Sequence, residues 1–249
     1  MFDLSSRVIV VTGGGAGIGK AITSAVAALG ATAVIADKNI SDAAAVAEEL
    51  TALNLSATAI ETDVSKSASV EDLLNRVVKD FGKLDVMVNN AGILGDAEIV
   101  DISDEAWQRF NAVNLDGVFY CCREAVRIMK TQGFGRIITI ASAGGKIAFP
   151  FAGVHYCAAK GAVMALTRQL ALQTAKYGIQ VNAVAPGTTR TEMVKHRSQE
   201  RIDFINRHIP VGRMGVPEEI AAAVVFMASD AAGFITGETL DVNGGLYMA

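Results

Sequence analysis

Short apolar runs alternate along the chain with longer segments in which apolar residues recur at the spacing of an amphipathic helix. Apolar runs rich in β-branched residues predict buried strands, and the longer segments predict helices. The predicted strands cover residues 7–12, 31–36, 57–62, 83–88, 136–141, 179–184 and 239–242. The predicted helices cover residues 20–29, 41–53, 67–81, 104–130, 154–177 and 217–229. This alternation predicts an α/β fold, a doubly wound parallel sheet of about seven strands with helices on both faces, in a single domain over 1–249.

The composition narrows the class of protein. Hydrophobic residues make up 51% of the chain and are spread evenly, which is enough for a large core. No uncharged apolar run approaches the length that spans a bilayer, and the first residues do not begin a signal peptide. The net charge is −4, with no basic tail or stripe, which argues against a nucleic-acid-binding protein. We therefore expect a cytoplasmic protein that binds neither membrane nor nucleic acid.

Cysteine and histidine are few and scattered. The three cysteines, Cys121, Cys122 and Cys157, lack the spacing of a metal site, and the three histidines are not clustered. We expect no metal ion and no disulfide framework, which fits a reducing compartment.

A glycine-rich turn joins the first predicted strand to the first predicted helix. It reads Gly13-Gly14-Gly15-Ala16-Gly17-Ile18-Gly19. Glycines let the backbone approach a pyrophosphate, and the N-terminus of the next helix offers free N–H groups and a positive dipole. Glycines also serve ordinary turns. The candidate cofactor-binding residues here are Gly13, Gly15, Gly17, Ile18 and Gly19.

An acidic residue, Asp37, follows the second predicted strand. A carboxylate at this place can accept hydrogen bonds from the adenosine ribose and repel a 2′-phosphate, which favours NAD over NADP. Lys38 follows directly and offers a phosphate a cation, whereas the glycine turn has no basic residue before Lys20. The plainer interpretation of Asp37 is a cap for the helix at 41–53.

Three side chains suited to alcohol chemistry lie between residues 142 and 160. Ser142 follows the fifth predicted strand, at the carboxyl edge where ligands of parallel sheets bind. Tyr156 and Lys160 are four residues apart, so they share one face of a helix. A phenol has a pKa of about 10, and a neighbouring ammonium lowers that pKa toward the working range. Together the three groups can hold, polarise and deprotonate an alcohol.

One polar residue, Asn114, interrupts the long helix predicted at 104–130. Asparagine is a mediocre helix former, so its presence needs a reason. A solvent-facing or capping side chain is the plain explanation.

Together these features resemble the short-chain dehydrogenase/reductase family over nearly the whole chain. The resemblance implies a Rossmann-like fold and an NAD(P)-dependent oxidoreductase that acts on a CH–OH group. It rests on the order and spacing of Thr12-Gly13-x-x-x-Gly17-x-Gly19, Asp37, Asp63-Val64, Asn89-Asn90-Ala91-Gly92, Asn114, Ser142, Tyr156-x-x-x-Lys160, and Pro186-Gly187 followed by Thr191.

The resemblance implies a role for each matching catalytic residue. Ser142 would bind the substrate oxygen, and Tyr156 would act as the general acid–base. Lys160 would lower the pKa of Tyr156 and bind the nicotinamide ribose. Asn114 would anchor a water molecule that relays the proton to solvent, which would explain a polar residue inside that helix.

The resemblance also implies that five segments contact the cofactor. The glycine turn would hold the pyrophosphate, and Asp37 the adenosine ribose. The remaining contacts would come from Asp63 and Val64 at the adenine, from Asn90, Ala91 and Gly92 beside the cofactor, and from Pro186, Gly187, Thr189 and Thr191 at the nicotinamide.

The substrate is the least determined part of the site. The candidate pocket residues are Gly144, Phe149, His155 and Met193, beside Ser142 and Tyr156. His155 also fits a place in the pocket wall or in solvent, and Cys157 is expected to turn away from the site and pack.

In the family, the segment 188–210 is usually a mobile lid over the substrate. Its basic residues suggest an anionic substrate, and the alternative is a solvated amphipathic helix. These residues are Arg190, Lys195, Arg197, Arg201 and Arg207.

NAD preference suggests an enzyme that transfers a hydride between NAD(H) and a secondary alcohol or ketone. The alternative is an NADPH-dependent reductase of 3-oxoacyl thioesters. A protein that binds the cofactor without catalysis is disfavoured, because the catalytic tetrad is complete.

The helices at 104–130 and 154–177 carry small and apolar residues on more than one face, and the C-terminal Leu246-Tyr247-Met248 is apolar. Since family members usually form homotetramers with two-fold axes, we expect a homotetramer.

Overall fold

The computed structural model describes residues 2–150, 152–192 and 198–248. Within them, parallel strands form a seven-stranded sheet in the order β3-β2-β1-β4-β5-β6-β7. The predicted fold class, a doubly wound α/β fold, is confirmed. The strands are β1 (Val8–Thr12), β2 (Thr32–Asp37), β3 (Ala57–Glu61), β4 (Val86–Asn89), β5 (Gly135–Ile140), β6 (Ile179–Pro186) and β7 (Thr239–Val242).

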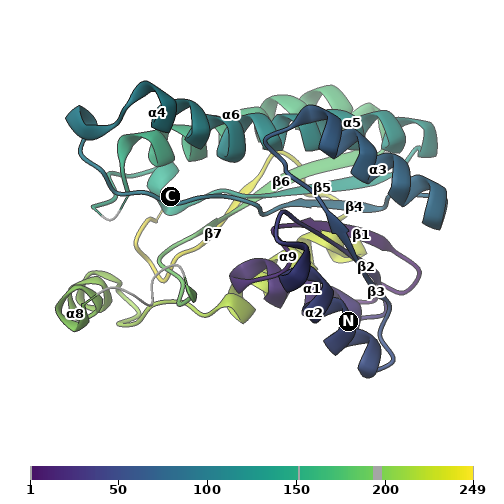
Figure 1. Ribbon diagram of the computed structural model, residues 1–249, viewed down its shortest axis with the longest axis horizontal. Coiled ribbons are helices and arrows are strands. Elements are labelled where there is room, and N and C mark those ends of the chain that lie inside the picture. The colour runs from purple at the N-terminus through teal and green to yellow at the C-terminus, as the bar shows by residue number, and fades with distance from the viewer. Residues whose placement is uncertain (1, 151, 193–197, 249) are drawn as a thin grey trace.

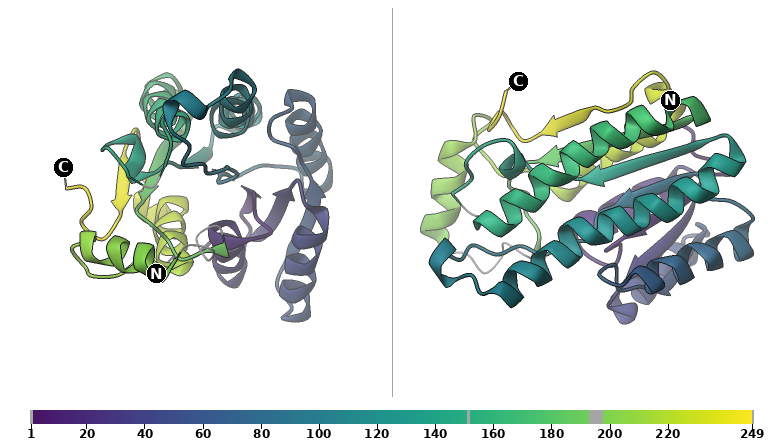
Figure 2. Two further views of the ribbon diagram at one scale, coloured as in Figure 1. Left: turned by 60° about the vertical axis from the view of Figure 1, so that its left-hand side comes forward. Right: turned by 90° about the horizontal axis from the view of Figure 1, so that it is seen from above.

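Helices cover both faces of this sheet (Figures 1 and 2). One layer contains α3 (Ser67–Phe81), α4 (Asp104–Asn111), α5 (Gly117–Gln132) and α6 (Val154–Thr174). The opposite layer contains α1 (Gly17–Ala28), α2 (Ile40–Ala52) and α9 (Pro217–Ala228). A further helix, α8 (Gln199–His208), lies beyond one end of the sheet (Figure 1). Among the described residues, no helix has the length and apolarity needed to cross a bilayer.

The core consists of two apolar clusters, one on each face of the sheet. Alternate residues of β1 supply them: Val8 and Val10 pack toward α3, α5 and α6, whereas Ile9 and Val11 pack toward α1, α2 and α9. Side chains of a strand alternate between faces, so a strand buried on both faces is apolar throughout. This explains why the central strands appear in the sequence as continuous apolar runs.

The structure differs from the predicted elements at three places. The helix expected at 104–130 is divided into α4 and α5 by a π-helical turn at Ala112–Asp116. Strand β6 continues through Pro186, where it pairs with Val242 of β7. The stretch 188–210, in which no helix was predicted, contains α8. Only a few of its apolar residues are buried, in a small cluster around Ile205 and Ile209.

The strand order reverses between β1 and β4, which lie side by side although three helices and two strands separate them in sequence. At such a point the connecting segments leave in opposite directions, and their carboxyl ends leave a crevice for ligands. The glycine turn after β1 and the Asn90 segment after β4 both open into this crevice.

Candidate active site

The glycine turn is held closed by contacts that leave no room for side chains. A Cβ atom at Gly19 would overlap the carbonyl oxygen of Gly13, and Gly13 has a φ of +63°. The side-chain amide of Asn90 donates to the carbonyl oxygens of Thr12 and Gly13, at 2.9 and 3.0 Å. No side chain caps the N-terminus of α1, so its first N–H groups remain available to an anion. The turn fits a dinucleotide pyrophosphate.

Three further predicted residues, Ile18, Asn90 and Ala91, border this turn. Ile18 is the second residue of α1, and its partly buried side chain packs against the core cluster that contains α1, α2 and α9. The backbone N–H groups of Asn90 and Ala91 donate to the Thr12 hydroxyl, at 3.0 and 3.1 Å. The ends of β1 and β4 are therefore fixed to each other where the cofactor is expected.

Asp37 ends β2 and faces the glycine turn. Its carboxylate accepts hydrogen bonds from the N–H groups of Gly15 and Asn39, each at 3.0 Å. The interpretation of Asp37 as the cap of α2 is wrong, because the Asn39 side chain caps that helix by accepting from Ser41 and Asp42. The carboxylate is instead placed between the pyrophosphate turn and the start of α2.

Asp63 and Val64, the residues predicted to contact the adenine, follow the end of β3. Asp63 accepts hydrogen bonds from Ser65, and Lys38 lies 3.1 Å away, so the pKa of the Asp63 carboxyl is lowered, first by Ser65 and then by Lys38. Lys38 is thus paired with Asp63 in this structure. Val64 packs on Gly117, where a Cβ atom would lie 3.0 Å from the Val64 side chain.

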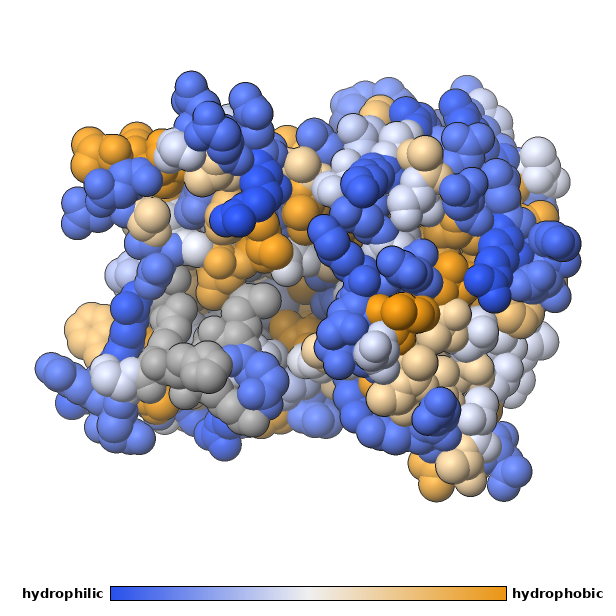
Figure 3. Space-filling model, in the orientation of Figure 1, coloured by the Kyte–Doolittle hydropathy of each residue, from blue (hydrophilic) through white to orange (hydrophobic). Residues whose placement is uncertain are grey.

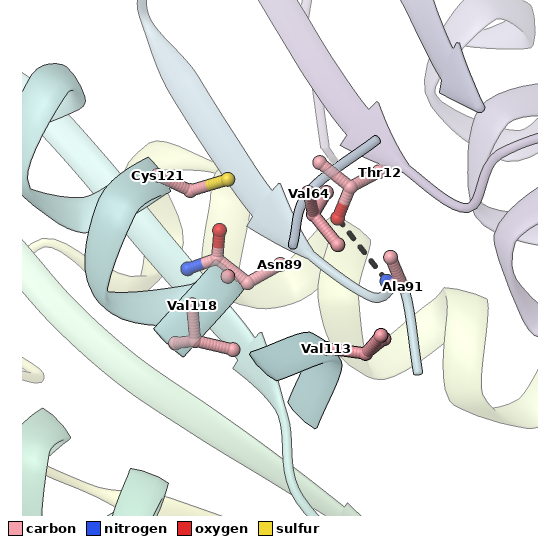
Figure 4. A pocket seen from close by; sticks show the side chains of 8 residues that line it. Thr12, Val64, Asn89, Ala91, Val113, Val118 and Cys121 are labelled. Atoms are coloured by element: carbon pink, nitrogen blue, oxygen red, sulfur yellow. Dashed lines mark hydrogen bonds between the residues drawn. The ribbon is translucent and has the colours of Figure 1, made fainter. Parts of the chain in front are cut away.

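A narrow pocket continues inward from Val64, between the ends of β1 and β4 and the start of α5 (Figure 4). Asn89 contributes its side chain to this pocket, and the buried oxygen of its side-chain amide has no hydrogen-bond partner. The other lining residues are Thr12, Val64, Ala91, Val113, Gly117, Val118 and Cys121.

The π-helical turn places Asn114 in the interior. Asn114 is fully buried, and its side-chain amide forms two hydrogen bonds of 3.1 Å with the backbone N–H and carbonyl of Ile93. The plain explanation, a solvent-facing or capping residue, is therefore wrong. An extra residue in a helical turn often marks a functional site, and here it turns a polar side chain toward the loop after β4.

Ser142, Tyr156 and Lys160 converge at the carboxyl end of β5. Tyr156 and Ser142 form a side-chain hydrogen bond. The Lys160 ammonium donates to the carbonyl of Ile140 at 2.8 Å and lies 5.7 Å from the centre of the Tyr156 ring. The one-turn spacing on a helix is confirmed, since Tyr156 and Lys160 both belong to α6.

Gly92 joins Asn114 to this group. A Cβ atom at Gly92 would lie 2.8 Å from the Asn114 amide oxygen and 3.6 Å from the Lys160 nitrogen. All four members of the predicted tetrad therefore surround one small region, although they come from three separate parts of the chain.

Burial governs the protonation of the central pair. Desolvation raises the pKa of Tyr156, and the hydrogen bond from Ser142 opposes this only in part. Desolvation also lowers the pKa of Lys160 to about 8. The pKa of Tyr156 is therefore raised in this structure and not lowered as expected, because desolvation of the phenol is the largest effect on it.

The predicted substrate residues are divided between pocket and wall. A Cβ atom at Gly144 would lie 3.3 Å from Phe149, 3.4 Å from the Cys157 sulfur and 3.5 Å from the Ser142 hydroxyl. Cys157 therefore packs, as expected, but against Gly144 beside the pocket. His155 is buried, with its ring 3.8 Å from that of Phe110, which places it in the wall. Met193 lies outside the described residues.

The segment that begins at Pro186 closes the other side of the crevice. Gly187 donates to Val242 of β7 at 3.0 Å, and Thr189 pairs with Gly215 in an isolated bridge. The Thr191 methyl group approaches Gly17 at the start of α1. The segment thus connects the sheet to the glycine turn.

Sequence reasoning named Gly92 but missed the loop that follows it, residues 93–98. It contacts Asn114, the start of α6 and, through Asp96, Arg201 of α8 at 3.0 Å. The glycines Gly92 and Gly95 were the only signal in the sequence. No group of His, Cys, Asp and Glu side chains in the described part of the chain is arranged to hold a metal ion.

Known proteins are similar to this chain in sequence and fold. A family model described as enoyl-(acyl carrier protein) reductase matches residues 13–247. A solved short-chain type dehydrogenase/reductase from Mycobacterium marinum matches with a TM-score of 0.95 and 35% identity, over 100% of this chain and 98% of that chain. The chain belongs to the short-chain dehydrogenase/reductase family.

Curated relatives of this dehydrogenase/reductase carry different names at the same level of identity. The 3-oxoacyl-[acyl-carrier-protein] reductase FabG of Escherichia coli K12 is 38% identical over 99% of both chains. The meso-2,3-butanediol dehydrogenase of Serratia marcescens is also 38% identical, over 96% of this chain and 94% of its own. The protein is accordingly an oxidoreductase that interconverts alcohol and carbonyl groups with a nicotinamide dinucleotide.

Proposed function

We propose that this enzyme transfers a hydride between NAD(H) and an uncharged secondary alcohol or ketone, with Tyr156 as its general acid–base. The observation that carries the proposal is the convergence of Ser142, Tyr156, Lys160 and Asn114 beside the glycine turn. The bound nicotinamide would accept or supply the hydride, and the protein would orient the substrate and move the proton.

Each residue of the tetrad has a part that its contacts support. The Ser142 hydroxyl holds the substrate oxygen beside the Tyr156 phenol, which gives or takes the proton. Lys160, fixed by the Ile140 carbonyl, places a positive charge near the phenol and favours the phenolate when it forms. Asn114 fixes the loop at Ile93, and its part in a proton relay remains a prediction.

The preference for NAD rests on Asp37. Its carboxylate is fixed by Gly15 and Asn39, so a 2′-phosphate on the neighbouring ribose would meet a negative charge that has little freedom to move away. Lys38, the cation that could offset this charge, is paired with Asp63. Both features favour NAD, which lacks the 2′-phosphate of NADP.

An uncharged substrate is favoured by the acidic residues of segment 96–105. This segment contains no Lys or Arg, and its acidic residues are Asp96, Glu98, Asp101, Asp104 and Glu105. Arg201, one of the residues considered for an anionic substrate, lies against Asp96. Lys195 and Arg197 lie outside the described residues, and Arg190 and Arg207 are exposed.

The test is a panel of initial rates, read by the absorbance of the reduced cofactor. It combines NAD(H) and NADP(H) with neutral secondary alcohols, their carboxylated counterparts and one 3-oxoacyl thioester. We expect kcat/KM to be at least about tenfold higher with NAD than with NADP, equivalent to ~1.4 kcal/mol. Faster reduction of the thioester with NADPH would establish the alternative function, which the name of the FabG relative supports.

A pair of variants makes the cofactor test specific. Asp37→Ala removes the charge beside the ribose and should raise kcat/KM with NADP. Asp72→Ala, at an exposed position of α3, removes the same charge elsewhere and should leave the ratio unchanged. An unchanged ratio in both variants would assign cofactor choice to other residues.

We further propose a homotetramer in a reducing compartment such as the cytoplasm. Phe119 of α5 and Leu172 of α6 expose 47% and 77% of their surface on the same layer of helices, which suits contact with another copy. The three cysteines are free thiols, which supports the reducing compartment.

A further inference from the structure

A tight turn from Ser142 to Lys146, here called the serine turn, follows β5. The carbonyl of Ser142 accepts a hydrogen bond of 3.0 Å from the N–H of Gly145, and the carbonyl of Ala143 accepts one of 2.9 Å from the N–H of Lys146. The Ser142 hydroxyl accepts a hydrogen bond of 3.1 Å from the N–H of Gly144. The position of this hydroxyl therefore depends on the shape of the whole turn.

One side of the serine turn rests on α6, the helix that carries Tyr156 and Lys160. A Cβ atom at Gly145 would lie 2.7 Å from the carbonyl carbon of Lys160 and 2.8 Å from the nitrogen of Gly161. A Cβ atom at Gly161 would lie 3.4 Å from the Gly145 carbonyl oxygen. The turn and the helix are in close backbone contact, so a shift of the turn would change how Ser142 lies relative to Tyr156.

The Lys146 side chain links the serine turn to β7. Its ammonium donates to the Asp241 carboxylate at 2.7 Å and to the Thr239 carbonyl oxygen at 3.4 Å. Strand β7 lies at one edge of the sheet, and β6 separates it from β5 (Figure 2). The ion pair therefore joins the segment after β5 to a strand that is not its neighbour in the sheet.

The Lys146–Asp241 pair is largely withdrawn from solvent. Hydrophilic side chains predominate along the outline of the face shown in Figure 3. In contrast to such surface groups, the side chains of Lys146 and Asp241 expose only 18% and 21% of their surface. The second oxygen of the Asp241 carboxylate is buried and finds no hydrogen-bond partner among the described residues. Loss of Lys146 would thus leave this carboxylate poorly satisfied, and such a loss costs more than at an exposed pair.

An aromatic ring of the C-terminal tail also contacts the ammonium. The centre of the Tyr247 ring lies 4.9 Å from the Lys146 nitrogen, within the range of a cation–π contact. The side chain of Asn243 fixes this tail, because it donates to the Tyr247 carbonyl at 3.2 Å and accepts from the N–H of Gly245 at 2.9 Å. All of these partners of the Lys146 ammonium therefore belong to β7 or to the tail that follows it.

We propose that Lys146 is a positioning residue that keeps the Ser142 hydroxyl aligned with Tyr156 by linking the serine turn to Asp241 of β7. The turn is held between α6 on one side and the ion pair on the other, so its hydroxyl keeps the place in which it bonds the Tyr156 phenol. Lys146 acts through Ser142 and touches no reacting atom. The inference rests on the proposed function, because it gives Lys146 a part in the same reaction.

The first test uses no substrate. Hydrogen exchange of the backbone amides at 145–147 is measured by NMR in wild-type protein, in Lys146→Met and in Asp241→Asn. We expect about two- to tenfold faster exchange in both variants, because either change removes the interaction that holds the turn closed. The control is Lys83→Met, which removes the lysine of the 2.8 Å Lys83–Asp85 pair and should leave this exchange unchanged. Unchanged exchange in both test variants would overturn the proposal.

The second test measures kcat and KM. Lys146→Met and Asp241→Asn change the local charge in opposite directions, so an effect of charge alone would move kcat in opposite directions. Loss of alignment should instead lower kcat in both variants, by up to about 100-fold, the effect of a displacement of about 1 Å. KM should change little, because alignment matters most in the transition state. Opposite changes in kcat, or no change in either variant, would contradict a positioning role.

A double-mutant cycle decides whether Lys146 acts through Ser142. Ser142→Ala removes the hydroxyl, so the addition of Lys146→Met should lower kcat by no more than about twofold further. Equal losses of kcat with and without the hydroxyl would mean that Lys146 supports the structure alone, and the proposal would be abandoned.

The kinetic tests separate this inference from the proposed function, because they use whichever substrate and cofactor react fastest in the panel described above. Coupled effects of Lys146 and Ser142 on reduction of the thioester with NADPH would keep the positioning role and remove the proposed function. Turnover of a secondary alcohol with NAD, combined with additive effects of the two residues, would keep the function and remove the role of Lys146.

Discussion

Tyr156 and Lys160 lie in surroundings that oppose charge on either side chain. Burial raises the pKa of Tyr156 and lowers the pKa of Lys160 to about 8. Near neutral pH the phenol therefore keeps its proton, while the amine remains largely an ammonium. This pair of states suits a group that must donate a proton to a ketone oxygen.

The pH dependence follows from these two directions. Reduction requires a protonated Tyr156 and a charged Lys160, so kcat/KM for the ketone should stay level below about pH 7 and fall as Lys160 loses its proton near a pKa of about 8. Oxidation requires Tyr156 to lose its proton, so its rate should rise with pH across the neutral range. Stopped-flow rates in both directions would measure this, and a reduction rate that rises through pH 8 would contradict it.

Removal of the phenolic hydroxyl isolates the chemical step. Tyr156→Phe should lower kcat by about 10²–10⁴-fold, the usual contribution of general acid–base catalysis. The ring and its packing are retained, so the dissociation constant for NADH, followed by fluorescence, should change little. Near-wild-type turnover in this variant would remove Tyr156 from its assigned role.

Irregular backbone shapes two elements of the candidate site. The glycine turn before α1 brings Gly13 and Gly19 into direct backbone contact. The π-helical turn between α4 and α5 directs Asn114 inward. In both elements the neighbouring atoms explain the residue type: the Gly13 carbonyl leaves no room for a side chain at Gly19, and the backbone of Ile93 bonds the Asn114 amide.

Gly19→Ala should open the glycine turn. Its methyl group would overlap the Gly13 carbonyl, so we expect a loss of roughly 1–3 kcal/mol in the free energy of unfolding and at least about tenfold weaker NAD binding. Denaturant titration and calorimetry measure the two effects. Gly133→Ala is the control, since Gly133 has a positive φ of +68°, which strains an alanine, but lies in open space with no atom for the methyl group to overlap. It should cost stability alone, whereas equal losses of NAD affinity in both variants would contradict the assigned role of the turn.

Across the whole molecule, polar networks occupy both ends of the sheet. At the amino ends of the strands, the buried Arg136 pairs with Asp230 at 2.9 Å, and Arg7 joins Asp230 to Asp85. This network fixes the ends that carry no catalytic residue. The residues of the candidate site, Ser142 and Asp37 among them, lie at the carboxyl ends of the strands. The C-terminal Leu246, expected to need another copy for burial, packs within its own chain beneath α8.

The homotetramer proposed above predicts a particle of about four times the chain mass of 26.0 kDa in light scattering. Phe119→Glu combined with Leu172→Glu places charge on the exposed layer of α5 and α6 and should reduce the mass, because desolvating unpaired carboxylates is costly. Leu53→Glu, at an equally exposed position after α2, should leave the mass unchanged. A wild-type particle of one chain mass would refute the tetramer.

The sequence by itself determined the fold class, the cofactor turn and the spacing of Tyr156 and Lys160, because each follows from local periodicity or from motifs within one turn of chain. Only the tertiary structure decided that Asn114 is buried on Ile93, that Asn39 rather than Asp37 caps α2, and that Asp96 meets Arg201. These contacts join residues that are far apart in the sequence and depend on how strands and helices pack. Such packing produces no repeating pattern of apolar and polar residues from which the contacts could be predicted. The same reason applies to the pKa of Tyr156, since the burial that raises it exists only in the assembled fold.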